Sequence, residues 1–264
     1  MKSDNRYLGA AIIAPFILFI FLGGRFLEAF TLILSVLGMY EFYKALKEKE
    51  FKPISVVGYA MLLIYYLINH NFETLMYIVV LATFILLIVP VINLKYTFID
   101  VALTLLGFLY VGIFFSFIYL VNIKEGGEFF VWLIFIGSWM TDTTAYYAGR
   151  LFGKTKLCPK VSPKKTVEGS LGGLLGAAIF CGLFGMVARK YGISVPLYHF
   201  LIIGGLCGVF SQFGDLVASS VKRYVGIKDY SHLIPGHGGI LDRFDSILFS
   251  GVIVFYYLTF IVNI

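Results

Sequence analysis

Residues 211–245, SQFGDLVASSVKRYVGIKDYSHLIPGHGGILDRFD, join two long apolar runs of the chain. This stretch gathers ionisable residues in an otherwise apolar sequence: Asp215, Lys222, Arg223, Lys228, Asp229, His237, Asp242, Arg243 and Asp245. Charged side chains are costly at membrane depth, and they persist mainly where they pair, bind ions or take part in chemistry. Because apolar helices are predicted on both sides, we expect Asp215 to face Asp242 and Asp245 near one membrane surface.

The composition indicates a membrane protein. Of 264 residues, 59% are hydrophobic and only 14% are charged, and the mean hydropathy is +0.90. A soluble domain carries about a quarter charged residues. The net charge is +6, and the positive residues lie between the apolar runs. The positive-inside bias explains this distribution more simply than nucleic-acid binding. We therefore expect no nucleic-acid partner. The three cysteines show no C-x-x-C spacing and indicate neither a disulfide framework nor a zinc site.

Nine apolar runs are long enough to cross a membrane as helices. They fall at about 7–23, 26–46, 54–69, 73–92, 97–122, 129–149, 167–191, 196–221 and 240–262. With the N-terminus inside, 17 of the 21 Lys and Arg residues lie on the cytoplasmic side, which agrees with the positive-inside rule. We therefore predict an all-α, polytopic bundle of about nine transmembrane helices, N-in and C-out, in a cell inner (plasma) membrane.

The two halves of the predicted single domain, residues 1–264, differ in chemistry. Residues 1–130 are expected to be mainly scaffold helices, and residues 131–264 carry the suggestive motifs and cytoplasmic loops. Glu28, Glu41 and Asp100 are the ionisable exceptions in the first half, and we expect structural or interfacial roles near helix ends.

Glycines in the second half recur at G-x-x-x-G spacing, in the pairs Gly172/Gly176 and Gly204/Gly208. Small residues at this spacing allow helices to approach closely in lipid. A nucleotide-binding glycine loop would need a strand–turn–helix context, which a membrane helix does not offer. The pattern therefore predicts tight helix packing.

A basic loop follows the sixth run and contains CPKVSPKKTVEGS, residues 158–170. Ser162 or Thr166 would cap the next helix, whose N-terminal amides suit an anion, and Lys164 and Lys165 would hold a phosphate. The alternative is an ordinary topogenic loop. Asp142, just before this loop, either is satisfied by neighbouring threonines or has a functional role.

The carboxylates of the opening stretch suggest a divalent cation. Asp242 and Asp245 are spaced i, i+3 and would share a helix face, so a cation shared with Asp215 would offset their repulsion. Carboxylates together with substrate phosphates are the ligands that Mg²⁺ uses. The glycine-rich turn before Asp242 gives backbone amides room to approach a phosphate. His237 is either a loop residue with its hydrogen bonds satisfied or a donor to a phosphate.

These features together favour phosphoryl or nucleotidyl transfer to a lipid at a cytoplasm-facing site. Lys222, Arg223 and Lys228 would neutralise further phosphate charge. Metal and basic residues would stabilise the charge that develops on the phosphorus oxygens and the leaving group.

Residues 219–245 resemble the signature of the phosphatidate cytidylyltransferase (CDP-diacylglycerol synthase) family. The matching positions read Ser219-x-x-Lys222-Arg223-x₄-Lys228-Asp229-x₄-Ile234-Pro-Gly-His-Gly-Gly-Ile-Leu-Asp242-Arg243-Phe244-Asp245. The segments Ser162-Pro-Lys-Lys-Thr-Val-Glu-Gly169 and Asp142-Thr-x-Ala-Tyr146 also resemble this family. Residues that match the family are frequent over 139–250, whereas over 1–130 only the hydropathy pattern is similar.

The resemblance implies the condensation of CTP with phosphatidic acid to CDP-diacylglycerol and pyrophosphate. It also implies a requirement for Mg²⁺, with room for a second cation. The family is further expected to act as a homodimer surrounded by membrane lipids. Asp215, Asp242 and Asp245, with Asp142 as a further candidate, are expected to be metal ligands or their supports. Five residues are expected to act in catalysis: Asp215, Asp242, Asp245, Lys222 and Arg223. The expected substrate-binding residues are Ser162, Lys164, Lys165, Thr166, Glu168, Lys228, His237, Gly238 and Arg243.

Two other functions fit parts of the pattern. An ion-coupled transporter would also place aspartates and broken helices in the membrane, although it favours inverted repeats and a midplane site. A lipid or polyprenol kinase would release a nucleoside diphosphate instead of pyrophosphate.

Overall fold

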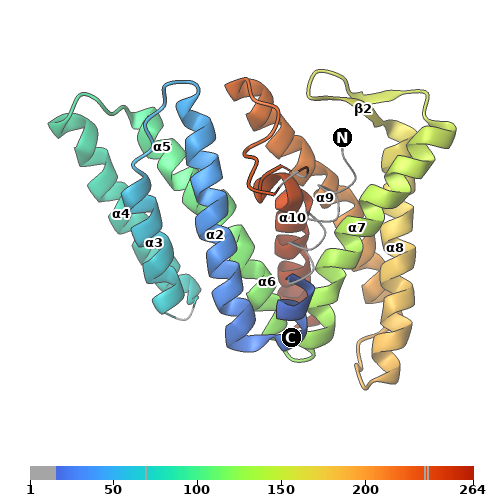
Figure 1. Ribbon diagram of the computed structural model, residues 1–264. Helices are drawn as coiled ribbons and strands as arrows, with labels where there is room; N and C mark the ends of the chain where they lie inside the picture. Colours follow the sequence, from blue (N-terminus) through green and yellow to red (C-terminus); the bar gives the residue numbers. More distant parts are fainter. Residues whose placement is uncertain (1–15, 69, 235, 237) are drawn as a thin grey trace.

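The computed structural model describes residues 16–68, 70–234, 236 and 238–264, and these residues are almost entirely helical (Figure 1). Residues 16–22 are helical and lead into α2. The elements that follow are α2 (Gly24–Lys47), α3 (Ser55–Leu67), α4 (Phe72–Ile92), α5 (Phe98–Leu106), the π-helix η1 (Gly107–Ile113), α6 (Phe114–Asn122), α7 (Gly127–Phe152), β1 (Lys156–Cys158), β2 (Ser162–Thr166), α8 (Val167–Lys190), α9 (Leu197–Val225), α10 (Leu241–Tyr257) and a second π-helix, η2 (Leu258–Val262).

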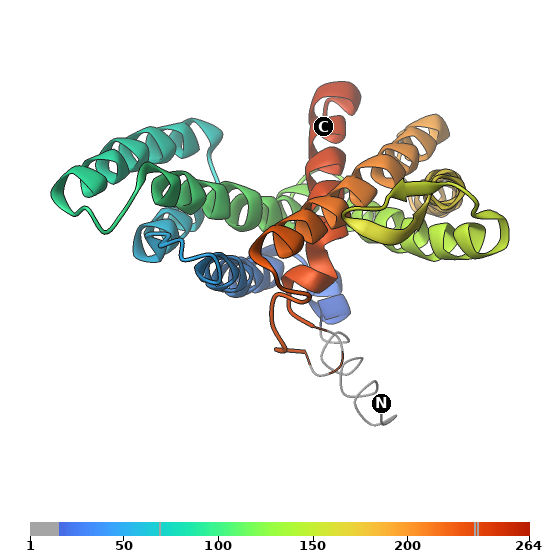
Figure 2. The same ribbon diagram turned by 90° about the horizontal axis from the view of Figure 1, so that it is seen from above.

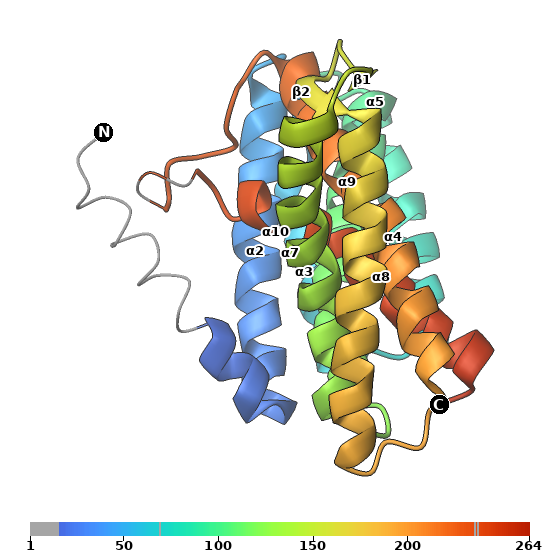
Figure 3. The ribbon, with the colours of Figure 1, turned by 90° about the vertical axis from the view of Figure 1, so that its right-hand side faces the viewer.

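The helices run up and down between two ends of an elongated bundle. Seen from above, α3, α4 and α5 lie at one side and α7 and α8 at the other (Figure 2). The α6 segment, α2 and α10 lie between them, and α9 packs against α7, α8 and α10. The connection after α9 turns back along the bundle, so that α10 begins below the level at which α2 and α9 end (Figures 1 and 3). The N-terminus of α10 is therefore recessed into the bundle.

Six helical segments in the described residues are long and apolar enough to cross a membrane, so this is a multi-pass membrane protein. They are Gly24–Lys47, Phe72–Ile92, Phe98–Asn122, Val167–Lys190, Leu197–Val225 and Leu241–Val262. The helix α3 has only 13 residues, and α7 is long but polar in its second half. Most of the expected first span, 7–23, lies outside the described residues. The number of nine spans and the N-in, C-out orientation stay predictions.

The predicted all-helical fold has one exception, because the basic loop contains a two-stranded antiparallel sheet. Strands β1 and β2 pair Lys156 with Thr166 and Cys158 with Ser162. The sequence indicated only a break in helix here, since proline cannot continue one. The Glu168 carboxylate accepts hydrogen bonds from the backbone amides of Lys154 and Thr155, and this ties the start of the hairpin to α8.

The glycine pairs mark close helix contacts, as predicted. A Cβ added at Gly176 would collide with the side chain of Thr144 on α7, and one at Gly204 would meet the backbone oxygen of Ala177 on α8. Helices α7, α8 and α9 consequently pack backbone against backbone, which holds the residues of their upper ends in fixed relation.

The π-helix η1 interrupts the span that was expected as one regular helix over 97–122. Ser35 on α2 donates a hydrogen bond of 3.0 Å to the carbonyl of Gly112, and Tyr43 donates one of 2.7 Å to the carbonyl of Thr104. Such insertions occur often at functional sites. Here the π-helix carries Tyr110 on its buried side.

The predicted structural roles of Glu41 and Asp100 are confirmed, although neither side chain reaches the solvent. Asp100 is 3% exposed and forms a capping box with Thr97, and its carboxylate also accepts the Lys52 amide at 2.6 Å. Glu41 is 1% exposed and bonds to the recessed end of α10. Burial is tolerated because several donors satisfy each carboxylate.

Candidate functional site

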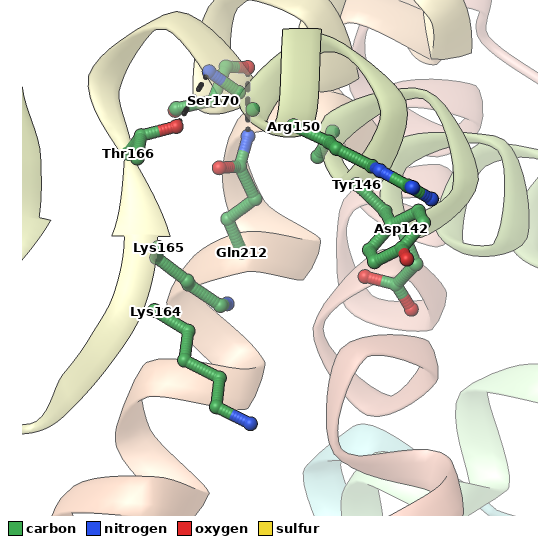
Figure 4. A pocket seen from close by; sticks show the side chains of 11 residues that line it. Asp142, Tyr146, Arg150, Lys164, Lys165, Thr166, Ser170 and Gln212 are labelled. Atoms are coloured by element: carbon green, nitrogen blue, oxygen red, sulfur yellow. Dashed lines mark hydrogen bonds between the residues drawn. The ribbon is translucent and has the colours of Figure 1, made fainter. Parts of the chain in front are cut away.

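A cavity of about 340 Å³ opens between α7, β2, the first turn of α8, and α9. Lys164 and Lys165 extend from β2 into it, and Asp142 and Arg150 of α7 lie on the opposite side (Figure 4). The structure thus brings Asp142 together with the Lys164–Thr166 segment, although they come from separate motifs. A cavity with both signs of charge on its walls suits an anion accompanied by a cation.

The N-terminus of α8 and Gln212 also line the cavity. The Thr166 hydroxyl accepts a hydrogen bond of 3.1 Å from the Gly169 amide, so Thr166 is the cap, and Ser162 lies at the start of β2. Gln212 donates to the carbonyl of Gly208 at 2.6 Å. It also donates to the carbonyl of Ser170 at 3.2 Å (Figure 4). The positive end of a helix dipole therefore borders the same space as the two lysines.

An ion pair between Lys165 and Asp215 joins this cavity to the acidic stretch. The Asp215 carboxylate also accepts a hydrogen bond from the Ser219 hydroxyl at 3.2 Å. Asp142, Asp215 and Asp245 lie close enough for their charges to repel one another. The hairpin and the acidic stretch therefore contribute to one site.

Asp245 and Tyr110 form the buried side of this carboxylate group. Asp245 is 8% exposed, and one of its oxygens accepts the Ser246 amide at 2.7 Å. The Tyr110 hydroxyl is buried, has no hydrogen-bond partner among the described residues, and lies within electrostatic range of Asp215 and Asp245. A buried polar atom without a partner is rare, so this hydroxyl is a candidate to bind an ion, a water or a substrate atom.

Asp242 faces a different set of partners from Asp245. Its carboxylate accepts hydrogen bonds from the Lys222 ammonium at 2.6 Å, the Tyr230 amide at 2.8 Å and the Gly239 amide at 2.9 Å. The i, i+3 spacing places both aspartates on the first turns of α10, but Asp242 organises the preceding loop. Burial raises the pKa of the Tyr230 phenol well above its ordinary value, so Tyr230 stays protonated beside this pair.

The other predicted residues lie around the rim or outside the described residues. Arg223, Lys228 and Arg243 are exposed, and Arg243 is within electrostatic range of Asp142. Gly238 has a φ of +85°, which favours glycine. The backbone amide of the next residue, Gly239, donates a hydrogen bond to Asp242. His237 lies outside the described residues. In the described part of the chain, no three His, Cys, Asp or Glu side chains lie close enough together to form a metal site by themselves.

Three residues of the site were not predicted. Tyr110 comes from the first half of the chain, where only hydropathy was informative, and Gln212 is a neutral residue in an apolar run. The third is Tyr230, and the Lys222 ammonium lies over its ring, 5.5 Å from the centroid. A polar residue inside an apolar run was the one sequence signal that could have pointed to Gln212.

The sequence is similar to known proteins over nearly its whole length. The chain matches the model of the cytidylyltransferase family over residues 4–261. It is 34% identical over 260 residues to the phosphatidate cytidylyltransferase of Bacillus subtilis (strain 168), covering 94% of this chain and 95% of that protein. It is 44% identical over 155 residues to the phosphatidate cytidylyltransferase of Staphylococcus saprophyticus, covering 59% of this chain and 58% of that protein. The match of the family model over nearly the whole chain shows that the protein belongs to the cytidylyltransferase family.

Proposed function

We propose that this protein is a phosphatidate cytidylyltransferase, which condenses CTP with phosphatidic acid to give CDP-diacylglycerol and pyrophosphate. The observation that carries the proposal is the Lys165–Asp215 ion pair, because it unites the basic hairpin with the acidic stretch beside membrane-spanning helices. The near full-length similarity to phosphatidate cytidylyltransferases supports the choice of nucleotide and lipid.

The reaction requires two anions to approach each other. An oxygen of the lipid phosphate attacks the α-phosphorus of CTP, the bond from that phosphorus to the bridging oxygen breaks, and pyrophosphate leaves with the bonding electrons. The attacking phosphate is already anionic, so little general-base help is needed. Lys164, Lys165 and the amides of the α8 N-terminus would hold the phosphates, and their positive charge would offset the repulsion.

The donor set fits Mg²⁺. Asp142, Asp215 and Asp245 carry hard oxygen atoms within electrostatic range of one another, although no three carboxylates of the described residues form a complete metal site by themselves. The Tyr110 hydroxyl, which has no partner among the described residues, lies within electrostatic range of Asp215 and Asp245. Mg²⁺ commonly takes only one or two carboxylates and completes its shell with waters and substrate phosphates. When bound, it would supply positive charge to the phosphorus oxygens and leaving group. We assign Asp242 a supporting role, since three donors already occupy its carboxylate.

The proposed setting is the cell inner membrane with the site facing the cytoplasm, where CTP is available. The loops 48–54, 93–97 and 153–166 lie at one end of the bundle (Figure 1), and the last of them carries five lysines, two of which line the cavity. Positive charge favours the cytoplasmic side of a membrane. A homodimer and a second cation remain expectations from the family resemblance.

Purified protein in lipid is expected to convert CTP and phosphatidic acid into CDP-lipid and an equal amount of pyrophosphate, and to stop when divalent cations are chelated. ATP, GTP and UTP serve as matched nucleotides. Release of a nucleoside diphosphate would indicate a lipid kinase instead. Uptake of an unaltered solute into proteoliposomes, with no turnover of any nucleotide, would indicate a transporter and contradict the proposal.

Removing the charge of Asp242 is expected to destabilise the protein as well as to lower its activity. Asp242→Asn leaves Lys222 largely buried without its counter-charge, and the loss of one partner of a buried ion pair costs about 3–5 kcal/mol. The double variant Lys222→Met/Asp242→Asn should regain stability but not turnover. Thermal unfolding and initial rates measure the two effects, and an Asp242→Asn protein as stable as the wild type would contradict this assignment.

A further inference from the structure

Glu41 on α2 contacts the catalytic stretch from about 200 residues away in sequence. Its carboxylate accepts hydrogen bonds from the Ser231 hydroxyl at 2.5 Å, the Ile240 amide at 2.9 Å and the Leu241 amide at 2.8 Å. The side chain is 1% exposed. Glu41 thus connects the scaffold half of the chain directly to the loop and helix that carry Asp242 and Asp245.

These contacts supply the missing cap of α10. Ile240 occupies the N-cap position, and an isoleucine side chain has no oxygen to accept the first amides of the helix. The Glu41 carboxylate accepts two of them, and its negative charge lies at the positive end of the helix dipole. Because α10 begins within the bundle, water cannot easily replace this cap (Figure 3).

The loop before α10 is held between two carboxylates. Asp242 binds the amides of Tyr230 and Gly239 from one side, and Glu41 binds Ser231, Ile240 and Leu241 from the other. Gly239 lies at the point of closest approach, where an added Cβ would lie 2.5 and 2.6 Å from the two Glu41 oxygens. A larger residue at this position would therefore displace the Glu41 carboxylate.

We propose that Glu41 is a positioning residue for the reaction. By fixing Ser231 and the first residues of α10, Glu41 sets where Asp245 lies relative to Asp215 and the Lys165 side of the cavity. Displacements of about 1 Å can cost about 100-fold in rate when reacting groups must be aligned. This inference rests on the proposed cytidylyltransferase activity, so its test includes a measurement that does not require turnover.

The test compares Glu41→Gln with Asp100→Asn. Both replace a buried carboxylate that accepts three hydrogen bonds by an amide of similar shape, but Asp100 caps α5 and binds Lys52, remote from the loop. We expect kcat to fall about 10- to 100-fold in Glu41→Gln, with a small change in the KM for CTP, and to stay near the wild-type value in Asp100→Asn. Ser231→Ala, which removes one donor and no charge, should give a smaller fall in kcat.

Hydrogen exchange of a peptide covering residues 230–244 gives the independent measurement. We expect faster exchange in Glu41→Gln and Ser231→Ala, and unchanged exchange in Asp100→Asn. Unchanged loop exchange in Glu41→Gln, or a rate loss that merely follows thermal stability in both carboxylate variants, would overturn the inference. An inactive wild-type protein would refute the proposed function, and loop exchange would still decide whether Glu41 holds this segment.

Discussion

Replacing Asp215 with asparagine is expected to lower the rate of CDP-lipid formation about 10²- to 10³-fold and to leave the protein folded. Asp215 is partly exposed, and asparagine keeps an oxygen that can accept the Ser219 hydroxyl. Its ion pair with Lys165 is also partly exposed, so losing the pair should cost at most about 1 kcal/mol of stability. The lost charge matters far more for the reaction, because removing one electrostatic group from a catalytic site typically lowers the rate about 10²- to 10³-fold.

Pyrophosphate release at increasing Mg²⁺ concentrations measures this effect, and thermal unfolding checks the fold. If Asp215 helps to hold the cation, the residual activity of Asp215→Asn should require more Mg²⁺ for half of its maximum. Glu128→Gln is the matched control, since Glu128 is an exposed carboxylate in the first turn of α7, at the opposite end from Asp142. Wild-type turnover by a folded Asp215→Asn protein would remove Asp215 from the proposed site.

Hydropathy predicted the helices well because the membrane imposes one requirement on every span. The chain must satisfy its backbone within each segment and present about 20 apolar residues. The expected runs 73–92 and 167–191 differ from α4 and α8 by only a residue at either end. Hydropathy does not report hydrogen-bond register, so the π-helix at Gly107–Ile113 could not be predicted in this way.

Part of the site was also predictable. Charged residues in an apolar chain are few, and Lys164, Lys165 and Asp215 stood out for that reason. The partner of each one was not predictable, since the i, i+3 rule places Asp242 and Asp245 on one helix face without saying what either contacts. Glu41 was expected to be structural, but its partner 200 residues away depends on how α2 packs against α10.

Gly204 and Gly205 are adjacent in α9 but face different surroundings, and this gives a second large expected effect. A Cβ at Gly204 would meet the Ala177 backbone oxygen of α8 and lie 2.7 Å from the Cβ of Cys181. A Cβ added at Gly205 would have no other part of the described structure within 4 Å. A bulky side chain should therefore separate α8 from α9 at the first position and be accommodated at the second.

We expect Gly204→Leu to destabilise the protein by about 3 kcal/mol or more, the upper part of the range for overpacked cores, because the obstacle is backbone that cannot rotate away. Gly205→Leu should remain close to the wild type in stability and in turnover. The monodisperse fraction in size-exclusion chromatography and the thermal midpoint compare the two variants. Since α9 also carries Gln212 and Asp215, any folded Gly204→Leu protein should turn over slowly. Equal behaviour of the two leucine variants would contradict the close α8–α9 contact on which the geometry of the site depends.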